Sequence, residues 1–337
     1  MTLFYDGGSL EKSLSADVAI RAMEVCFDAE AAGKTRLPPR IDTPTGKGFI
    51  RVMPAVLDDV MGLKVMTLVE GLGNRYLVLL YDVRTSELLA LFDADELTRV
   101  RTAAVTALAG RAMVERPPST LGLIGTGFEA VGHLRMFAKV WPLTDVQVYS
   151  PNAERRGRFA ELMSRELGIR VTAADSSADA LRDQRAIVLA TKAKVPVIDG
   201  ADVAPGAVVL SIGSTRLDLR ELDNASLARA SVVVADDPQM VQLESADIAE
   251  TIAAGLLDPA RIQALSNCRR EGIARRPGGD ISIFKSVGTA LQDLALARMI
   301  YYDDTMRSAA TALPELTRLK PFSAKAFDAE VTAATSN

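Results

Sequence analysis

Short apolar runs alternate with segments of helical periodicity between residues 119 and 287. The apolar runs predict strands, and the periodic segments predict helices. Most of these runs are apolar at every position, which is typical of strands whose sheet is covered on both faces. We therefore expect an α/β fold with a doubly wound parallel sheet. The predicted strands are residues 120–124, 146–149, 169–173, 186–191, 207–212, 231–235 and 281–287; the predicted helices are 128–140, 153–167, 176–183, 224–229 and 238–256, with a loop at 269–280.

The first 117 residues have a different pattern. A stripe of Ile20, Met23 and Phe27 predicts a helix over 15–32, with Ser15 as a candidate N-cap. Four apolar runs separated by Asp, Gly and Asn predict strands, and an alanine-rich helix follows them. The sequence at 115–118 ends that helix, so we place a domain boundary there. A later apolar helix covers 288–302, and its tail should return to the first domain; the four predicted strands are 48–56, 62–69, 75–83 and 88–92.

Residues 125–130 form a G-x-G-x-x-A motif between a predicted strand and a predicted helix. Gly125 would permit the tight turn, Gly127 would let a pyrophosphate approach the backbone, and Ala130 would let the helix pack against the strand. The N–H groups at the helix start would hold the phosphate. The strand at 146–149 completes a β-α-β unit. We therefore predict a Rossmann dinucleotide site; the alternative is a tight turn that binds no ligand.

Composition narrows the class of protein. The 337 residues are enough for two domains, and the net charge of −4 with dispersed Lys and Arg makes nucleic acid an unexpected partner. The one histidine, His133, excludes a two-histidine zinc site, and we expect no metal. Cys26 and Cys268 are far apart in the sequence, which suits a reducing compartment. We see no signal peptide and no membrane span, so we expect a cytoplasmic protein.

The end of the second strand of the β-α-β unit indicates which nicotinamide cofactor is preferred. NAD sites usually carry a carboxylate there, which binds the ribose 2′-hydroxyl. This chain has Ser150, Asn152, Arg155 and Arg156 instead. Because a guanidinium suits a 2′-phosphate, we predict a preference for NADP(H) over NAD(H). If both arginines are only solvated helix residues, the protein is indifferent between the two cofactors.

Several stretches together resemble the ornithine cyclodeaminase/mu-crystallin family. The resemblance spans nearly the whole chain, and RTAA and KSVG-x-A-x-x-D are its most specific pieces. It implies a homodimer whose NAD(P)-binding Rossmann domain, residues 118–302, interrupts a substrate-binding and dimerisation domain made of residues 1–117 plus 303–337. The matching stretches are LPPR at 37–40, GLK at 62–64, LTRVRTAA at 97–104, LGLIGTGFEA at 121–130, SIGSTRLDLREL at 211–222 and FKSVGTALQDLALA at 284–297.

The resemblance also implies a site for a small substrate that carries a carboxylate. Arg40 and Arg101 would hold that carboxylate, and Lys64 would face the reacting carbon and nitrogen, with Met53 beside them. Three cations in one place suit a small carboxylate, although each alone is more often a surface charge. The residues expected to bind the cofactor are Gly125, Thr126, Gly127, Phe128, Glu129, Ala130, Ser150, Asn152, Arg155, Thr191, Gly213, Ser214, Lys285, Ser286, Val287 and Gly288.

A departure from the family pattern at residues 213–215 bears on the reaction. Cyclodeaminases of the family carry an aspartate where this chain has Thr215, and a hydroxyl cannot serve as a general base near neutral pH without help. Asp218 and Glu221 are close in sequence but align elsewhere. Branches with a hydroxyl or apolar residue here are similar to NAD(P)H-dependent reductases of imino acids and cyclic ketimines.

We therefore predict an oxidoreductase that uses NADPH to reduce a 2-imino acid or cyclic ketimine to the L-amino acid. Δ1-pyrroline-2-carboxylate and Δ1-piperideine-2-carboxylate are the favoured substrates, and an open-chain imino acid is the alternative substrate. Lys64, Arg101 and Thr215 are the expected catalytic residues. Two alternatives remain. One is an ornithine cyclodeaminase, a lyase that forms L-proline and ammonia, and the other is a non-catalytic, crystallin-like binder of NADPH and a small ligand.

Overall fold

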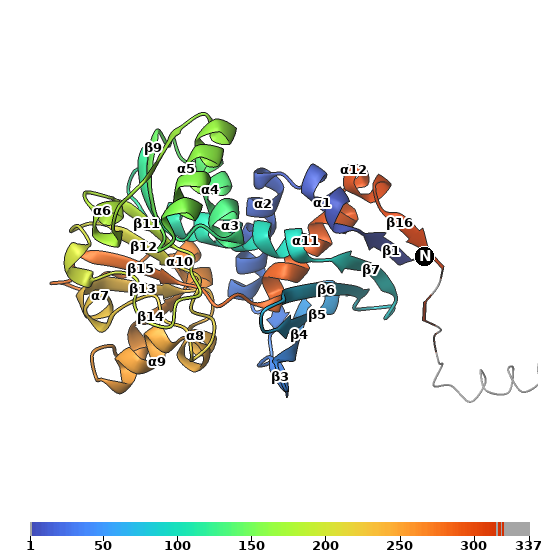
Figure 1. Ribbon diagram of the computed structural model, residues 1–337. Helices are drawn as coiled ribbons and strands as arrows, with labels where there is room; N and C mark the ends of the chain where they lie inside the picture. Colours follow the sequence, from blue (N-terminus) through green and yellow to red (C-terminus); the bar gives the residue numbers. More distant parts are fainter. Residues whose placement is uncertain (1, 315, 318, 320–337) are drawn as a thin grey trace, which may run out of the picture.

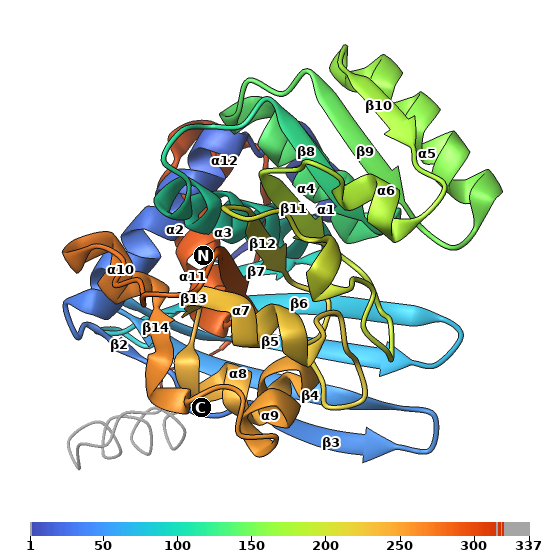
Figure 2. The same cartoon turned by 90° about the vertical axis from the view of Figure 1, so that its left-hand side faces the viewer.

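Two eight-stranded sheets, joined by a layer of helices, make up the structure (Figure 1). The computed structural model describes residues 2–314, 316, 317 and 319. The helices α2 (Ala16–Ala31), α3 (Asp95–Met113) and α11 (Ala290–Tyr302) lie between the sheets (Figures 1 and 2). α3 packs against α2 on one side and α4 (Phe128–Val140) on the other, so it connects the two domains.

The strands of the Rossmann sheet all run parallel, in the order β10-β9-β8-β11-β12-β15-β13-β14. β8 and β11 are neighbours, and the chain leaves them toward opposite halves of the sheet. Such a switch point is where doubly wound folds bind ligands, outside the carboxyl ends of the strands. The predicted doubly wound sheet is therefore confirmed. The strands are β8 Thr120–Ile124, β9 Asp145–Tyr149, β10 Arg170–Ala173, β11 Ala186–Leu189, β12 Val208–Ser211, β13 Ala230–Ala235, β14 Ile262–Ala264 and β15 Ile281–Lys285.

The helices around this sheet agree with the predicted ones except in the last third. The single helix predicted over 238–256 is wrong, because the chain breaks at Ser245, whose backbone is extended with φ −102° and ψ 117°. The loop predicted at 269–280 begins later, since a helix continues through Glu271. The helices are α5 Ala153–Leu167, α6 Ser177–Leu181, α7 Asn224–Arg229, α8 Pro238–Glu244, α9 Ala246–Ala253 and α10 Leu265–Glu271.

The second sheet draws strands from both ends of the chain. β1 pairs in parallel with β7 and antiparallel with β16, so the chain returns to this sheet after the Rossmann domain. β4, β5, β6 and β7 form an antiparallel meander. β3 was not predicted from the sequence, because it contains no apolar run and all of its residues are exposed. The strands are β1 Thr2–Tyr5, β2 Thr35–Arg36, β3 Ile41–Thr45, β4 Gly48–Leu57, β5 Val60–Val69, β6 Gly73–Asp82, β7 Leu88–Asp93 and β16 Thr311–Leu313.

The packing of α11 bears on the domain boundary. This helix contacts α2, α3, β4, β5 and β6, all of which precede the Rossmann domain in the sequence. We therefore propose that the second boundary lies before α11, rather than at the predicted residues 302–303. The short helices α1 (Gly7–Ser13) and α12 (Asp304–Ser308) belong to the same domain. Positions 315, 318 and 320–337 of the predicted first domain lie outside the described residues. Within the described part of the chain, no helix has the length and apolar character needed to span a membrane.

Candidate active site

The glycine loop joins β8 to α4 at the switch point. Gly125 has φ 121°, and a Cβ there would lie 2.3 Å from the Ala190 carbonyl oxygen, so glycine is required by the turn itself. Gly127 is different, because its φ of −91° suits any residue and a Cβ would meet nothing within 4 Å. No described side chain caps α4 at Gly127, which leaves its first N–H groups for a ligand. These features fit a pyrophosphate. Thr126 Oγ1 donates to Ser150 Oγ at 3.0 Å and ties the loop to the end of β9.

The end of β9 presents the groups predicted to recognise the cofactor ribose. Asn152 caps α5 by accepting from the Arg155 backbone N–H at 2.8 Å. The Arg155 side chain is exposed and makes no ion pair with a described residue. Arg156 is turned inward, where it donates to the Ser150 carbonyl oxygen at 3.1 Å and lies over the ring of Tyr149. Of the two arginines, Arg155 is therefore the one available to a 2′-phosphate.

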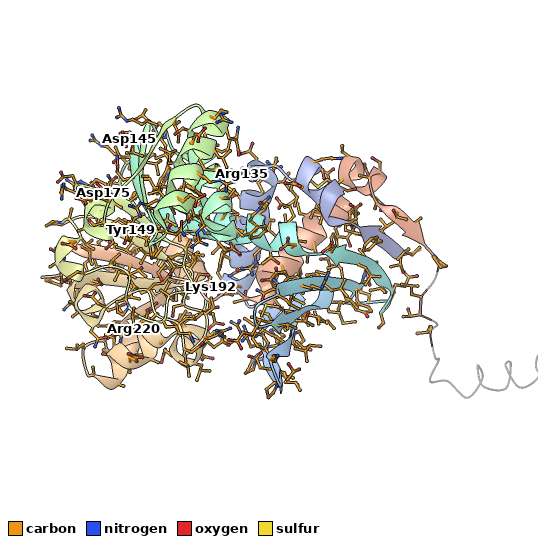
Figure 3. The ribbon with its side chains drawn as sticks, viewed as in Figure 1. Arg135, Asp145, Tyr149, Asp175, Lys192 and Arg220 are labelled. Atoms are coloured by element: carbon orange, nitrogen blue, oxygen red, sulfur yellow. The ribbon has the colours of Figure 1, made fainter. Side chains whose placement is uncertain are left out.

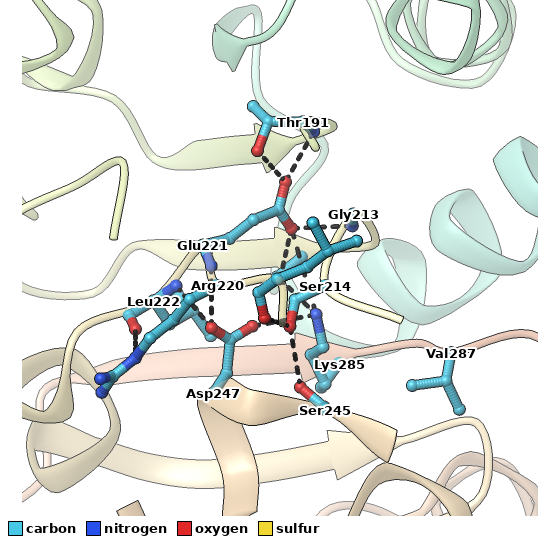
Figure 4. A network of polar contacts seen from close by, with 12 residues as sticks. Thr191, Gly213, Ser214, Arg220, Glu221, Leu222, Ser245, Asp247, Lys285 and Val287 are labelled. Carbon is cyan, nitrogen blue, oxygen red and sulfur yellow. Dashed lines mark hydrogen bonds and ion pairs between the residues drawn. The ribbon is translucent and has the colours of Figure 1, made fainter. Parts of the chain in front are cut away.

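A buried carboxylate supports the strand ends on the other side of the switch point (Figure 4). One oxygen of Glu221 accepts from the N–H and the hydroxyl of Thr191 at 2.7 and 2.9 Å. The other accepts from Ser211 Oγ and the Gly213 N–H, each at 2.8 Å. Thr191 and Gly213 are thus held in place with their polar groups engaged. Ser214, also predicted to bind cofactor, is buried and donates its hydroxyl to the Leu219 carbonyl oxygen.

Lys285 belongs to the same network. Its side chain is fully buried, its Nζ lies 3.0 Å from Asp247 Oδ2, and it donates to Ser211 Oγ at 2.9 Å. Asp247 also accepts from the backbone N–H groups of residues 221 and 222. The predicted contact of Lys285 with a nicotinamide stays a prediction. In the structure its ammonium lies inside the Rossmann domain, between Ser211 and the carboxylate of Asp247 (Figure 4).

Asp236 fixes the segment that follows β15. Its Oδ2 accepts from Ser286 Oγ at 2.6 Å and the Gly288 N–H at 2.8 Å, and its Oδ1 accepts from the Val287 N–H at 3.2 Å. Gly288 has φ 75°, and a Cβ there would lie 2.8 Å from Arg101 Nη1. The segment predicted to line the cofactor is therefore held directly against a residue predicted to bind substrate.

Lys64 and Arg101 share one buried carboxylate. Lys64 Nζ lies 2.9 Å from Asp293 Oδ1, and Arg101 Nε lies 3.1 Å from the same oxygen. The exposed fractions of the three side chains are 3%, 7% and 0%. Lys64 also donates to Thr98 Oγ1 at 2.8 Å, and Arg101 Nη1 donates to Gln292 Oε1 at 2.8 Å. Two cations thus share one anion, which leaves a positive charge that a substrate carboxylate would neutralise.

The pKa of the Lys64 ammonium lies close to neutral pH. Burial lowers its pKa from 10.5 to about 8; Asp293 opposes the shift and Arg101 adds to it. The ring of Tyr76 lies 4.8 Å from the ammonium. A pKa near neutral suits a group that exchanges a proton during a reaction.

Arg40 reaches the same segment from the other side. It donates to the Gly288 carbonyl oxygen at 3.2 Å and forms an ion pair with Glu244 of α8. Gly288 therefore contacts both predicted carboxylate-binding arginines. Met53, also predicted at the substrate, is buried and lies directly opposite Lys64 in the pairing of β4 with β5.

The carboxylates nearest to Thr215 in the sequence are engaged by other residues. Thr215 is half-buried, and no described residue hydrogen-bonds its side chain. Asp218 is paired with Arg216 at 2.8 and 2.9 Å, while Glu221 is committed to the buried network. The catalytic role of Thr215 stays a prediction.

The one histidine is a structural residue of α4. His133 is fully buried, its Nδ1 donates to the Glu129 carbonyl oxygen at 2.7 Å, and its Nε2 lies 3.0 Å from Thr106 Oγ1. Burial lowers its pKa from 6.5 to about 4, so it is neutral at physiological pH.

Sequence reasoning missed the acidic residues that organise the site. Asp293 and Gln292 lie at the start of the apolar helix α11, and Asp293 is the aspartate of the KSVG-x-A-x-x-D stretch, to which no role in the site was assigned. Asp236 follows an apolar strand at residues 230–235 and carried no motif.

Comparison with known proteins finds a family, relatives and solved structures that are similar to this chain. The model of the ornithine cyclodeaminase/mu-crystallin family matches residues 4–308. The ketimine reductase mu-crystallin of Mus musculus is 30% identical over 285 residues, which cover 82% of this chain and 87% of that protein. The structure of Thermococcus litoralis Δ1-pyrroline-2-carboxylate reductase in complex with NADH and L-proline has a TM-score of 0.86 at 29% identity, covering 92% of this chain and 100% of that one. An archaeal alanine dehydrogenase dimer with bound NAD has a TM-score of 0.85 at 25% identity, covering 93% and 99%.

Proposed function

The chain belongs to the ornithine cyclodeaminase/mu-crystallin family, and we propose that it is an NADPH-dependent reductase of a 2-imino acid or cyclic ketimine. Δ1-pyrroline-2-carboxylate and Δ1-piperideine-2-carboxylate are the favoured substrates, with L-proline and L-pipecolate as products. The observation that carries the proposal is the sharing of Asp293 by Lys64 and Arg101, next to the segment 286–288 of the Rossmann domain. A carboxylate with an adjacent C=N bond complements two neighbouring cations.

Different residues of the site would bind the substrate carboxylate and polarise the imine. Nε and Nη1 of Arg101 are held by Asp293 and Gln292, while Nη2 donates to no described residue. That group would hold the substrate carboxylate, together with Arg40, and so orient the imine carbon. Lys64, as an ammonium, would polarise the imine. Thr215 would hydrogen-bond the substrate nitrogen or an ordered water.

The cofactor would be held by three segments of the Rossmann domain. The glycine loop and the start of α4 would bind the pyrophosphate, Ser150, Asn152 and Arg155 the adenosine ribose, and the segment 286–288 the nicotinamide side. When bound, the dihydronicotinamide supplies the hydride that reduces the imine carbon.

A reductase is favoured over a cyclodeaminase by the surroundings of Thr215. A lyase of this family needs a carboxylate at that position, and this chain has a hydroxyl. The nearest carboxylates along the sequence are Asp218, paired with Arg216, and Glu221, which is fully buried. Neither is free to act on a substrate amine.

The preference for NADPH rests on Arg155. Its exposed guanidinium lies at the end of β9 beside Ser150 and Asn152, and that strand end carries no carboxylate. A 2′-phosphate is a dianion that a guanidinium binds well. Comparison of kcat/KM for NADPH and NADH tests this, and an equal or higher value for NADH would overturn it.

A homodimer is also proposed. The outer face of the sheet carries an apolar row in register, Val52 against Val65 against Leu77, and no described helix covers it. Ile50 and Val69 are exposed on the same sheet. A second copy of this chain would bury such a face, as the alanine dehydrogenase dimer suggests. Light scattering should give twice the chain mass, and Leu77→Asp should reduce it; a monomeric wild type would overturn the dimer.

Oxidation of NADPH in the presence of a panel of substrates tests the reaction. The panel holds cyclic ketimines, 2-oxo acids with ammonia or methylamine, and L-ornithine, and released ammonia is measured in parallel. We expect oxidation with one class of imine. Ammonia from L-ornithine without net loss of NADPH would mean a cyclodeaminase, and tight NADPH binding with no turnover would mean a binder.

A further inference from the structure

Glu129 is a carboxylate of the Rossmann domain that faces the cations of both domains. It lies in the first turn of α4. The charges of Arg101 and Arg99 on α3, Lys64 on β5 and Lys192 after β11 all act on it. Lys192 lies on the side of the Rossmann domain that faces the substrate domain (Figure 3). Glu129 therefore lies directly after the glycine loop, where the charges of cations from both domains act on its carboxyl group.

One oxygen of this carboxyl group has no partner. Glu129 Oε2 is sealed from solvent and makes no hydrogen bond with a described residue. The buried carboxylates of Asp236 and Glu221 in the same domain have both oxygens hydrogen-bonded, and Asp247 Oδ2, which also makes no hydrogen bond, lies 3.0 Å from the ammonium of Lys285. A buried oxygen that is left without a partner costs free energy, which is expected where a ligand completes the contact.

We propose that Glu129 donates the proton that the imine nitrogen needs during reduction. This inference rests on the proposed function, because only a C=N substrate requires it. The dihydronicotinamide is oxidised as its hydride adds to the imine carbon. The π pair of the C=N bond moves to nitrogen, where an N–H bond forms as the O–H bond of Glu129 breaks. The product is a secondary or primary amine, and solvent returns a proton to the carboxylate.

The surroundings of Glu129 act on both the protonated carboxyl group and the carboxylate. Burial raises the pKa of its carboxyl group, and the surrounding cations, Arg101 first, oppose that rise. Tyr76 on β6 also faces it, and His133 of its own helix is neutral and bonded to its backbone. The raised pKa favours the protonated carboxyl group before the reaction, and the charges of Arg101 and Lys64 favour the carboxylate after it. Lys64 then polarises the imine and keeps its own proton.

Glu129→Gln removes the proton while keeping the shape of the side chain. We expect kcat for a cyclic ketimine to fall about 100-fold near pH 8, with KM and NADPH affinity nearly unchanged. The loss should shrink at acid pH, where the imine arrives already protonated. Glu129→Asp retains a proton and should recover part of the rate. Glu30→Gln is the matched control, because Glu30 is another partly buried carboxyl between the domains, bonded to Ser266 and outside the site.

A second measurement does not depend on turnover. Infrared difference spectra of the wild type minus Glu129→Gln, with NADPH bound and no imine added, should contain the carbonyl band of a protonated carboxyl group at neutral pH. An ionised Glu129 under those conditions would overturn the inference. A Glu129→Gln variant with the same rate and pH profile as an active wild type would also overturn the inference. The reductase proposal would then still stand. A wild type that reduces no imine would instead overturn the reductase proposal and this inference together.

Discussion

Two lysines are buried among the described residues, and their surroundings differ in charge. Lys285 lies inside the Rossmann domain, 3.0 Å from Asp247 and 4.0 Å from Glu221. Lys64 lies between the domains and pairs with Asp293, but Arg101 contacts the same oxygen, Oδ1. Lys285 therefore has carboxylates in excess, whereas Lys64 shares a single carboxylate with a second cation.

From this difference we propose a structural role for Lys285 and a functional role for Lys64. Buried charges are tolerated when they are paired and hydrogen-bonded, and Lys285 meets that condition within its own domain. Lys64 meets it only in part, which is why burial lowers its pKa to about 8. A substrate carboxylate would supply the missing anion. The positive excess is thus a cost to stability that binding can recover.

Lys64→Met should produce the largest change. We expect kcat/KM for a cyclic ketimine to fall about 10³-fold, because the imine loses its polarising ammonium. The melting temperature should be equal to or above that of the wild type, since a charge that burial disfavours is removed while Asp293 keeps Arg101. Steady-state kinetics and thermal melting on the same sample check both. A variant that is active, or strongly destabilised, would place Lys64 in the same class as Lys285.

Lys285→Met should lower the stability of the protein and change its activity little. Removing this ammonium leaves Asp247 and Glu221 buried without their cation, which should lower the free energy of unfolding by about 3 kcal/mol. Urea denaturation measures that loss, with Lys64→Met as the matched buried-lysine control. Protein that remains folded should keep kcat within about threefold, because the ammonium of Lys285 points away from the site. Unchanged stability would contradict the structural role.

The pH dependence separates the two lysines further. The ammonium of Lys64 is lost as pH rises through about 8, so kcat/KM should fall about tenfold per pH unit above that value. Stability should move the other way. Because the folded-state pKa lies below 10.5, the unfolded chain binds more protons between about 8 and 10.5, and stability rises by roughly 3 kcal/mol across that window. In Lys64→Met the stability gain should disappear, while Lys285→Met should retain it.

The sequence alone predicted the Rossmann sheet because its strands are short, apolar and regularly spaced. β8, β9 and β12 begin and end within one or two residues of the predicted runs. The break at Ser245 could not be predicted, since the residues around it continue a helical pattern. It turns Asp247 toward Lys285, which is a contact between residues far apart in the chain.

The site was predicted through the family resemblance more than through pattern. Arg40, Lys64 and Arg101 carry no periodic signal, and the structure brings all three to the segment 286–288 and Asp293. The acidic partners were missed because their role depends on tertiary contacts. Sequence reasoning placed Lys285 at the cofactor, whereas the orientation of its ammonium is decided by Asp247.

Arg155→Ser should have the smallest effect, because Arg155 is exposed and its charge is screened by solvent. We expect KM for NADPH to rise about fivefold, with kcat and KM for NADH unchanged, since only the 2′-phosphate loses a partner. Arg156→Ser is the comparison variant: its guanidinium holds the Ser150 carbonyl oxygen, so its loss should affect both cofactors alike. An unchanged KM for NADPH in Arg155→Ser would show that Arg155 is a solvated helix residue. The choice of cofactor would then have to come from Ser150 and Asn152, whose neutral side chains discriminate far less between a phosphate and a hydroxyl.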